Sequence, residues 1–148
     1  MHHAFGWTLA EWQTAYRSGT ITPDILLTLA AEYPADDNAW IARATPAQLT
    51  AQLVQLSERL AAVGGDIARL ALYGVPFAIK DNIDAAGWET TAACPEFAYT
   101  AAQDAAVVQA LREAGAILMG KTNLDQFATG LVGTRSPYGA VGNSFNGD

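Results

Sequence analysis

Two short apolar runs separated by a helical segment constrain this fold more than any other feature of the sequence. The runs are Val75–Ile79 and Ala116–Met119, and each has the length of a single strand. Such runs are typical of strands that are buried on both faces. A strand, a crossover helix and a second strand form a βαβ unit with a parallel strand pair. We therefore predict the α/β class, with a helical N-terminal region laid on a sheet.

The first 70 residues carry helical patterns, each with a start signal. Threonines that can cap a helix precede three segments, at Thr8, Thr22 and Thr45. Apolar residues of the third segment recur every three or four positions, which indicates a stripe facing the core. We expect helices over residues 8–18, 22–33 and 45–63, and a short strand at 39–41. The chain is thus predicted to comprise a helical N-terminal region, residues 1–70, and the start of an α/β core, residues 71–148.

Within the α/β core we expect two further helices, each with its own cap. Asp104 is expected to cap the crossover helix, with Val107 and Val108 on its inner side. Asn123 is expected to cap a short helix that ends at Phe127. The intervening residues after the first strand lack periodicity and are interrupted by a glycine and a proline, so they are predicted to be irregular up to about residue 100. A glycine-rich loop without periodicity follows the last helix.

The sequence contains only two lysines, and both follow an apolar run. They are Lys80 and Lys121, whereas the other six basic residues are arginines. Functional groups gather at the carboxyl ends of strands in open α/β sheets. An apolar layer beside Lys80 would disfavour its ammonium form, so that the neutral amine acts as a base. Asp81 would oppose this effect, and Asn82 could orient the amine by a hydrogen bond.

A structural interpretation stands beside the catalytic one for both lysines. Lys80 could extend from the strand end into solvent and pair with Asp81. For Lys121 the structural interpretation is favoured more strongly, because Gly120 precedes it and Thr122 and Asn123 follow it, as in a turn that leads to a helix cap.

Charge and the rarity of cysteine and histidine exclude several classes of function. The net charge of −7 argues against a nucleic-acid groove or a contact with an anionic membrane. Cys94 is the only cysteine and cannot form an internal disulfide, and no signal peptide or membrane span is recognisable, which predicts a cytoplasmic protein. The only histidines are His2 and His3, which disfavours a zinc site, a Ser-His-Asp triad and a catalytic role for Cys94.

Three segments of the α/β core resemble the amidase signature family, in the family's order and at fitting distances. Gly74-Val-Pro-Phe-Ala-Ile-Lys-Asp-Asn82 resembles the lysine motif, and Gly115–Asn123 and Phe127–Gly139 resemble the next two segments. Within the family, residues 122–139 and 90–99 are similar to the allophanate hydrolase branch. The resemblance implies a mixed sheet flanked by helices, and it covers the N-terminal helices more loosely.

The resemblance also implies a mechanism and a set of site residues. In the family, a serine attacks the amide carbonyl and a second serine, in a cis peptide, relays its proton to a lysine; Lys80 matches that lysine, and Asp81 and Asn82 complete its motif. Ala128, Thr129 and Gly130 match a loop that faces the substrate pocket. No metal or organic cofactor is implied. The implied substrate is allophanate, urea-1-carboxylate, broken down to ammonia and carbon dioxide or bicarbonate, and the full-length enzyme could be a homodimer.

The sequence departs from the family pattern at the nucleophile. Both family serines lie in a Gly-Gly-Ser-Ser-rich segment that is expected shortly after Asp148, whereas Ser136 and Ser144 lack flanking glycines. We therefore predict the N-terminal part of an allophanate hydrolase that is inactive alone and prone to self-association. The alternatives are a general amidase, a glutamyl-tRNA amidotransferase A-type subunit, or a non-catalytic α/β fragment.

Overall fold

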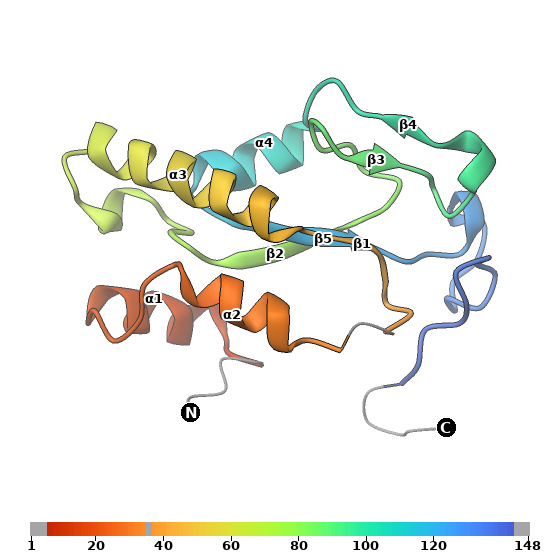
Figure 1. Cartoon of the computed structure of the whole chain (residues 1–148), viewed down its shortest axis with the longest axis horizontal. Coiled ribbons are helices and arrows are strands. Elements are labelled where there is room, and N and C mark those ends of the chain that lie inside the picture. The colour runs from red at the N-terminus through yellow and green to blue at the C-terminus, as the bar shows by residue number, and fades with distance from the viewer. Residues whose placement is uncertain (1–5, 35–36, 144–148) are drawn as a thin grey trace. The chain divides into compact units, whose positions relative to one another are not determined.

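The structure is a computed structural model that describes residues 6–34 and 37–143. His2, His3 and Ser144 lie outside the described residues. Figure 1 shows the helices and strands, and its labels are used below. In chain order the longer elements are α1 (Leu9–Arg17), α2 (Ile25–Glu32), β1 (Trp40–Arg43), α3 (Pro46–Ala62), β2 (Pro76–Lys80), α4 (Ala106–Glu113) and β5 (Ile117–Thr122). The short elements are η1 (Ile67–Arg69), β3 (Glu89–Thr90), η2 (Pro95–Phe97), β4 (Tyr99–Thr100) and η3 (Gln126–Ala128).

Reciprocal capping boxes start two of the N-terminal helices. At α1, Thr8 Oγ1 accepts a hydrogen bond from the Glu11 amide, and the Glu11 carboxylate accepts one from the Thr8 amide. At α3, Thr45 and Gln48 make the equivalent pair. Each box satisfies amides that a helix start would otherwise leave without partners. The predicted start and extent of these two helices are confirmed.

The start predicted for the second helix is wrong by two residues, because the N-cap is Asp24 and not Thr22. α2 begins at Ile25, and Asp24 at its N-cap makes no capping bond. The hydroxyl of Thr22 donates to Asp24 Oδ2 at 3.2 Å, a bond within the turn that precedes the helix. Local side-chain bonds of this kind compete with capping.

The main sheet has three strands in the order β1-β5-β2 and is mixed. β1 runs antiparallel to β5, with Trp40 opposite Thr122. β2 and β5 run parallel, because the Ile117 amide donates to the Val75 carbonyl near their starts and the Asp81 amide donates to the Thr122 carbonyl near their ends. With α4 between them, β2 and β5 form the predicted βαβ unit, and the predicted mixed α/β fold is confirmed.

Several local predictions for the core region are wrong. The stretch predicted to be irregular contains a two-stranded antiparallel sheet, β3 and β4, in which Thr90 lies opposite Tyr99. β2 is not buried on both faces, because Ala78 is exposed between two partly or fully buried neighbours. In α4 the Val108 side chain is fully buried, whereas Val107 is 53% exposed and does not face inward.

The chain forms two compact units, and each combines segments from both sides of residue 70. Unit 1 comprises residues 1–33, 44–77 and 110–119, and unit 2 comprises 34–43, 78–109 and 120–148. The boundary at residue 70 stays a prediction. The core of unit 1 is apolar, and its buried members are Trp12, Tyr16, Leu26, Leu29, Leu49, Leu56, Leu70 and Ile117.

Unit 2 is filled differently. Among the described residues, the buried polar and charged side chains all belong to it: Asp81, Thr90, Thr91, Lys121 and Asp125. Residues at or after the carboxyl ends of β2 and β5 are therefore held by polar contacts.

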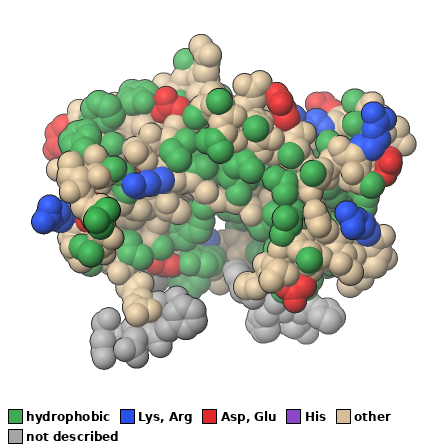
Figure 2. All heavy atoms as spheres, turned by 180° about the vertical axis from the view of Figure 1, so that it is seen from behind, with side chains coloured by type: hydrophobic (Ala, Val, Ile, Leu, Met, Phe, Trp, Pro, Cys, Tyr) green, Lys and Arg blue, Asp and Glu red, His purple; other side chains and the backbone are tan. Residues whose placement is uncertain are grey.

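Hydrophobic side chains are also exposed at the surface. Figure 2 shows hydrophobic side chains on the face that it draws, with acidic and basic ones interspersed. Large exposed apolar side chains include Val54 in unit 1 and Phe97, Phe127 and Leu131 in unit 2. Across the described residues, no helix is both long enough and apolar enough to span a membrane.

Candidate active site

The predicted lysine motif occupies the carboxyl end of β2 and the turn after it. Lys80 is the last residue of β2, and its side chain is exposed. The Ile83 amide donates to the Lys80 carbonyl at 2.9 Å and closes a turn over Asp81 and Asn82. Asn82 is exposed as well. The apolar layer expected around Lys80 is not present in the described part of the chain.

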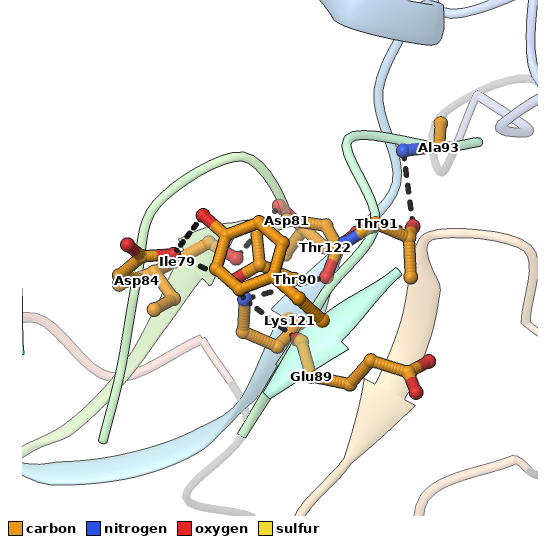
Figure 3. A network of polar contacts seen from close by, with 10 residues as sticks. Ile79, Asp81, Asp84, Glu89, Thr90, Thr91, Ala93, Lys121 and Thr122 are labelled. Carbon is orange, nitrogen blue, oxygen red and sulfur yellow. Dashed lines mark hydrogen bonds and ion pairs between the residues drawn. The ribbon is translucent and has the colours of Figure 1, made fainter. Parts of the chain in front are cut away.

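Asp81 pairs with a different lysine from the one that the sequence suggested. Asp81 does not pair with Lys80; its Oδ1 lies 3.4 Å from the ammonium of Lys121. Lys121 lies inside β5, where its side chain is fully buried, and not in a turn before a helix cap as predicted. Figure 3 shows its ammonium directed at this carboxylate and at the start of β3.

The ammonium of Lys121 makes two hydrogen bonds and one ion pair. It donates to the carbonyl of Glu89 at 2.9 Å and to Thr90 Oγ1 at 3.1 Å, and the ion pair is the one with Asp81. Burial lowers the pKa of Lys121, and the nearby charge of Asp81 opposes that shift. Two of its three N–H donors therefore have hydrogen-bond acceptors within the protein.

A turn at Thr91–Ala93 joins the lysine motif to the predicted pocket loop. The hydroxyl and the amide of Thr91 both donate to Asp81 Oδ2, at 2.5 and 2.9 Å, and the same hydroxyl accepts from the Ala93 amide at 3.1 Å. On the other side, the carbonyl of Ala92 accepts from the Phe127 amide at 2.9 Å. The Gln126 side chain adds a bond to the Ala93 carbonyl at 3.1 Å.

Both sides of this junction adopt the left-handed backbone conformation without glycine. Ala92 and Ala93 have φ of 51° and 57°, and Phe127 and Ala128 have φ of 52° and 56°. Such conformations are unfavourable for residues with a Cβ atom and are concentrated at functional sites. We call residues 91–93 and 126–128 together the left-handed junction.

The predicted pocket loop is organised by Asp125. Its Oδ2 accepts from the amides of Val132 and Gly133, both at 3.0 Å, and its Oδ1 accepts from the Arg135 amide at 2.7 Å. These bonds, that to Arg135 first, hold the pKa of Asp125 below its usual value. A Cβ atom on Gly130 would clash with this carboxylate, which explains a glycine there.

Asn123 does not cap a helix as predicted. Its amide nitrogen donates to the carbonyls of Asn38 and Gly139, at 2.9 and 3.0 Å, and its Oδ1 accepts from Ser136 Oγ at 2.6 Å. A short 3-10 turn, η3, replaces the expected helix. Ser136 is thus bonded within the loop, and its exclusion as the nucleophile stays a prediction.

The structure brings Lys80, Asp81 and Asn82 together at one turn. Ala128 is the last residue of the left-handed junction, and Thr129 and Gly130 follow it. No hydrogen bond joins these three residues directly to Lys80 in the described residues. Lys121 was singled out in the sequence, as a charged residue close to an apolar run, but was expected to lie in a turn. Thr91 and Asp125 were missed as site residues, and neither carried such a signal.

Other candidate sites lack the chemistry. Over residues 6–34 and 37–143, no cluster of three or more His, Cys, Asp or Glu side chains could hold a metal ion. A hollow of about 450 Å³ in unit 1 lies between α2 and α3, and none of the predicted site residues line it. The thiol of Cys94 pairs with Glu96, with 3.5 Å between Sγ and Oε2.

Comparisons with known proteins point to one family. A sequence profile described as Amidase matches residues 25–148. The urea amidolyase of Saccharomyces cerevisiae is 46% identical over 147 residues, which cover 97% of this chain and 8% of that protein. A subunit of the glutamyl-tRNA(Gln) amidotransferase of Akkermansia muciniphila is 37% identical and is covered over 27% of its length, against 92% of this chain.

A solved structure matches as well. A variant of Kluyveromyces lactis allophanate hydrolase superimposes with a TM-score of 0.85 at 44% identity, over 96% of this chain and 23% of that one. The chain therefore spans about a quarter or less of the length of the relatives named here.

Proposed function

We propose that this chain, which belongs to the amidase family, supplies the lysine base of an allophanate-hydrolysing enzyme, and that Lys80 is that base. One observation carries the assignment. Two lysines stand at the carboxyl ends of neighbouring parallel strands, and only Lys80 has an exposed side chain and no hydrogen-bond or ion-pair partner in the described residues. The ammonium of Lys121 is occupied by two hydrogen bonds and one ion pair.

In the proposed reaction, a serine hydroxyl attacks the amide carbonyl of allophanate while its proton passes through a second serine to the neutral amine of Lys80. The C–N bond then breaks, the leaving nitrogen takes that proton, and ammonia departs. Water, deprotonated along the same route, then hydrolyses the acyl-serine: the serine oxygen recovers its proton, and the acyl group leaves as N-carboxycarbamate, which breaks down to the second ammonia and carbon dioxide. Lysine suits this role because its neutral amine is a strong base and stands at the end of a flexible side chain.

The surrounding residues have supporting roles in this proposal. Asp81 is turned away from Lys80 and held by Thr91 and Lys121, so its charge is engaged elsewhere. Asn82, exposed beside Lys80, orients the amine or a relay hydroxyl. Ala128, Thr129 and Gly130 line the substrate pocket, on a loop fixed by Asp125.

The remaining expectations are part of the same proposal. The likeness to urea amidolyase and allophanate hydrolase over nearly the whole chain supports allophanate as the substrate. We further propose a cytoplasmic enzyme that acts as a homodimer without a metal or organic cofactor and without binding nucleic acid or a membrane. Neither the attacking serine nor the serine that relays its proton has a counterpart in this sequence, which predicts that the 148 residues alone do not hydrolyse amides.

A chimera tests the assignment. This chain replaces the matching segment of Kluyveromyces lactis allophanate hydrolase, and ammonia release from allophanate is measured. We expect Lys80→Ala and Lys80→Arg each to lower kcat by roughly 10²–10⁴-fold, because arginine keeps the charge but cannot act as a neutral base. Arg69→Ala, at an exposed position in unit 1, is the matched control and is expected to keep full activity.

Two results would overturn the proposal. Full activity of Lys80→Arg would remove Lys80 as the base. A chimera that hydrolyses simple amides or glutamine but not allophanate would favour a general amidase or an amidotransferase instead.

A further inference from the structure

We infer that Lys121 is a positioning residue, which holds the Lys80 turn and the pocket loop in a fixed relation through the left-handed junction. This inference rests on the proposed function of Lys80. Within residues 6–34 and 37–143, the Lys121 ammonium makes no hydrogen bond or ion pair with the pocket loop or with Lys80, and it acts through Asp81 and Thr90.

The first half of the argument concerns the Lys80 turn. Asp81 directly follows Lys80 and is fully buried. Its amide is fixed by the Thr122 carbonyl at 3.0 Å, and its side chain is fixed by Thr91 on one oxygen and by Lys121 on the other. Apart from the ion pair, Asp81 Oδ1 has no partner in the described residues. Without Lys121, Asp81 Oδ1 would be a buried charged oxygen without its ion-pair partner. The turn that carries Lys80 would then be free to rotate outward, where water can solvate the carboxylate.

The second half concerns the pocket loop. Lys121 also fixes Glu89 and Thr90, the two residues of β3 that lead directly into the Thr91 turn. That turn is bonded through Ala92 to the amide of Phe127, the residue before Ala128. One ammonium therefore holds Asp81, at one end of the hydrogen-bonded path to the pocket loop, and also Glu89 and Thr90, which lead into the Thr91 turn in the middle of that path (Figure 3).

Stability alone is a poor reason to bury this charge. A buried ion pair contributes little net stability compared with well-packed apolar residues, because desolvation offsets the attraction. An apolar side chain at position 121 would serve as well for packing, as Leu118 does elsewhere in the same strand with full burial. The carboxylate that follows β2 and the two acceptors on β3, in contrast, can be joined by one ammonium and by no apolar residue.

Hydrogen exchange of backbone amides in the 148-residue chain tests the inference directly. In Lys121→Met we expect the protection of the Asp81, Ile83 and Phe127 amides to fall at least tenfold more than that of Asn123, which also lies in unit 2 and bonds to the Ala39 carbonyl. Lys80→Met is the matched control and should leave all four unchanged. An equal loss at all four amides, or none, would reduce Lys121 to a general structural residue.

A second variant covers the case in which Lys121→Met does not fold. The double variant Asp81→Asn with Lys121→Met removes both buried charges and leaves an amide that can still accept from Thr91. We expect it to fold and to show the same selective loss. Wild-type protection at Asp81 and Phe127 in this variant would refute the inference.

Activity separates this inference from the proposed function. In the chimera, Lys121→Met is expected to lower kcat at least tenfold and also to raise the KM for allophanate, because the base and the pocket loop both lose their fixed positions. If Lys80→Arg is inactive but Lys121→Met keeps wild-type kcat, only the positioning role fails. If Lys80→Arg is active, the proposed function fails, and the exchange experiment still decides whether Lys121 orders the path.

Discussion

Both units bury apolar side chains, but among the described residues only unit 2 adds buried polar and charged ones to them. Unit 1 buries tryptophan, tyrosine, leucine and isoleucine from α1, α2, α3 and β5, with carbonyls and amides paired inside helices. Unit 2 buries two carboxylates, two threonine hydroxyls and an ammonium close to the strand ends. Apolar packing tolerates changes of shape as long as volume is kept, whereas a satisfied polar network depends on every member. The difference teaches that unit 1 supplies a scaffold and unit 2 holds the geometry of the site.

The largest test of this contrast is the removal of the buried charge. We expect Lys121→Met to lower the free energy of unfolding by about 3–5 kcal/mol, because it leaves the buried carboxylate of Asp81 without its partner. Lys80→Met, the same substitution at an exposed lysine, should change it by less than about 0.5 kcal/mol. Urea unfolding followed by circular dichroism measures both. If the two variants lost similar amounts of unfolding free energy, the buried lysine would contribute no more to stability than the exposed one.

A smaller effect is expected from crowding the same strand. A Cβ atom at Gly120 would meet the Ala42 carbonyl and the ring of Trp40 on β1, so Gly120→Ala should cost about 1–3 kcal/mol. Gly142→Ala, where a Cβ atom would meet nothing nearby, serves as the control and should be close to neutral. Thermal unfolding of the two variants gives the comparison. A neutral Gly120→Ala would show that β1 can move away from β5 at little cost.

Methionine in the apolar core should have a smaller effect still. Leu49 on α3 is 1% exposed, and Leu49→Met keeps its volume and polarity, so we expect a loss below about 1.5 kcal/mol by urea unfolding. Substitution by methionine is thus expected to cost much more unfolding free energy at position 121 than at position 49. The contrast between the units would break down if Leu49→Met were as costly as Lys121→Met.

The smallest effect concerns pH and the pocket loop. The pKa of Asp125 is lowered from 3.8 by its backbone hydrogen bonds, so the stability it contributes is complete above that pH and is lost as the pH falls through the lower folded value. Unfolding measured from pH 5 to pH 2 should show a shallower decline for Asp125→Asn than for the wild type. Parallel curves would indicate that the loop bonds persist when the carboxyl group is protonated.

The sequence was informative where structure depends on neighbours in the chain. The capping threonines Thr8 and Thr45 and the two apolar runs identified α1, α3, β2 and β5, because each signal is contained within a few residues. The two-residue strands β3 and β4 were missed, because two residues cannot show a period.

The site was predicted only in part, for a related reason. Lys80 stood out by its motif, but the burial of Lys121 depends on residues 31 to 40 positions earlier in the chain, Asp81, Glu89 and Thr90. Asn123 had a plausible local role as a helix cap. Its actual partners, Asn38 and Gly139, come together only once the chain has folded.

The left-handed junction has a consequence for the unfolded chain. Three of its four positive-φ positions are alanine, where glycine would adopt the conformation without strain. Alanine also restricts the denatured ensemble, by an amount that partly offsets its strain when folded. Replacing Ala92 or Ala93 by glycine would relieve strain in the folded state and add freedom to the unfolded chain, so the two effects on the free energy of unfolding would nearly cancel. Melting curves could therefore stay almost unchanged while the turn becomes a flexible joint, and loss of rigidity at the site would go unnoticed in any screen based on thermal stability.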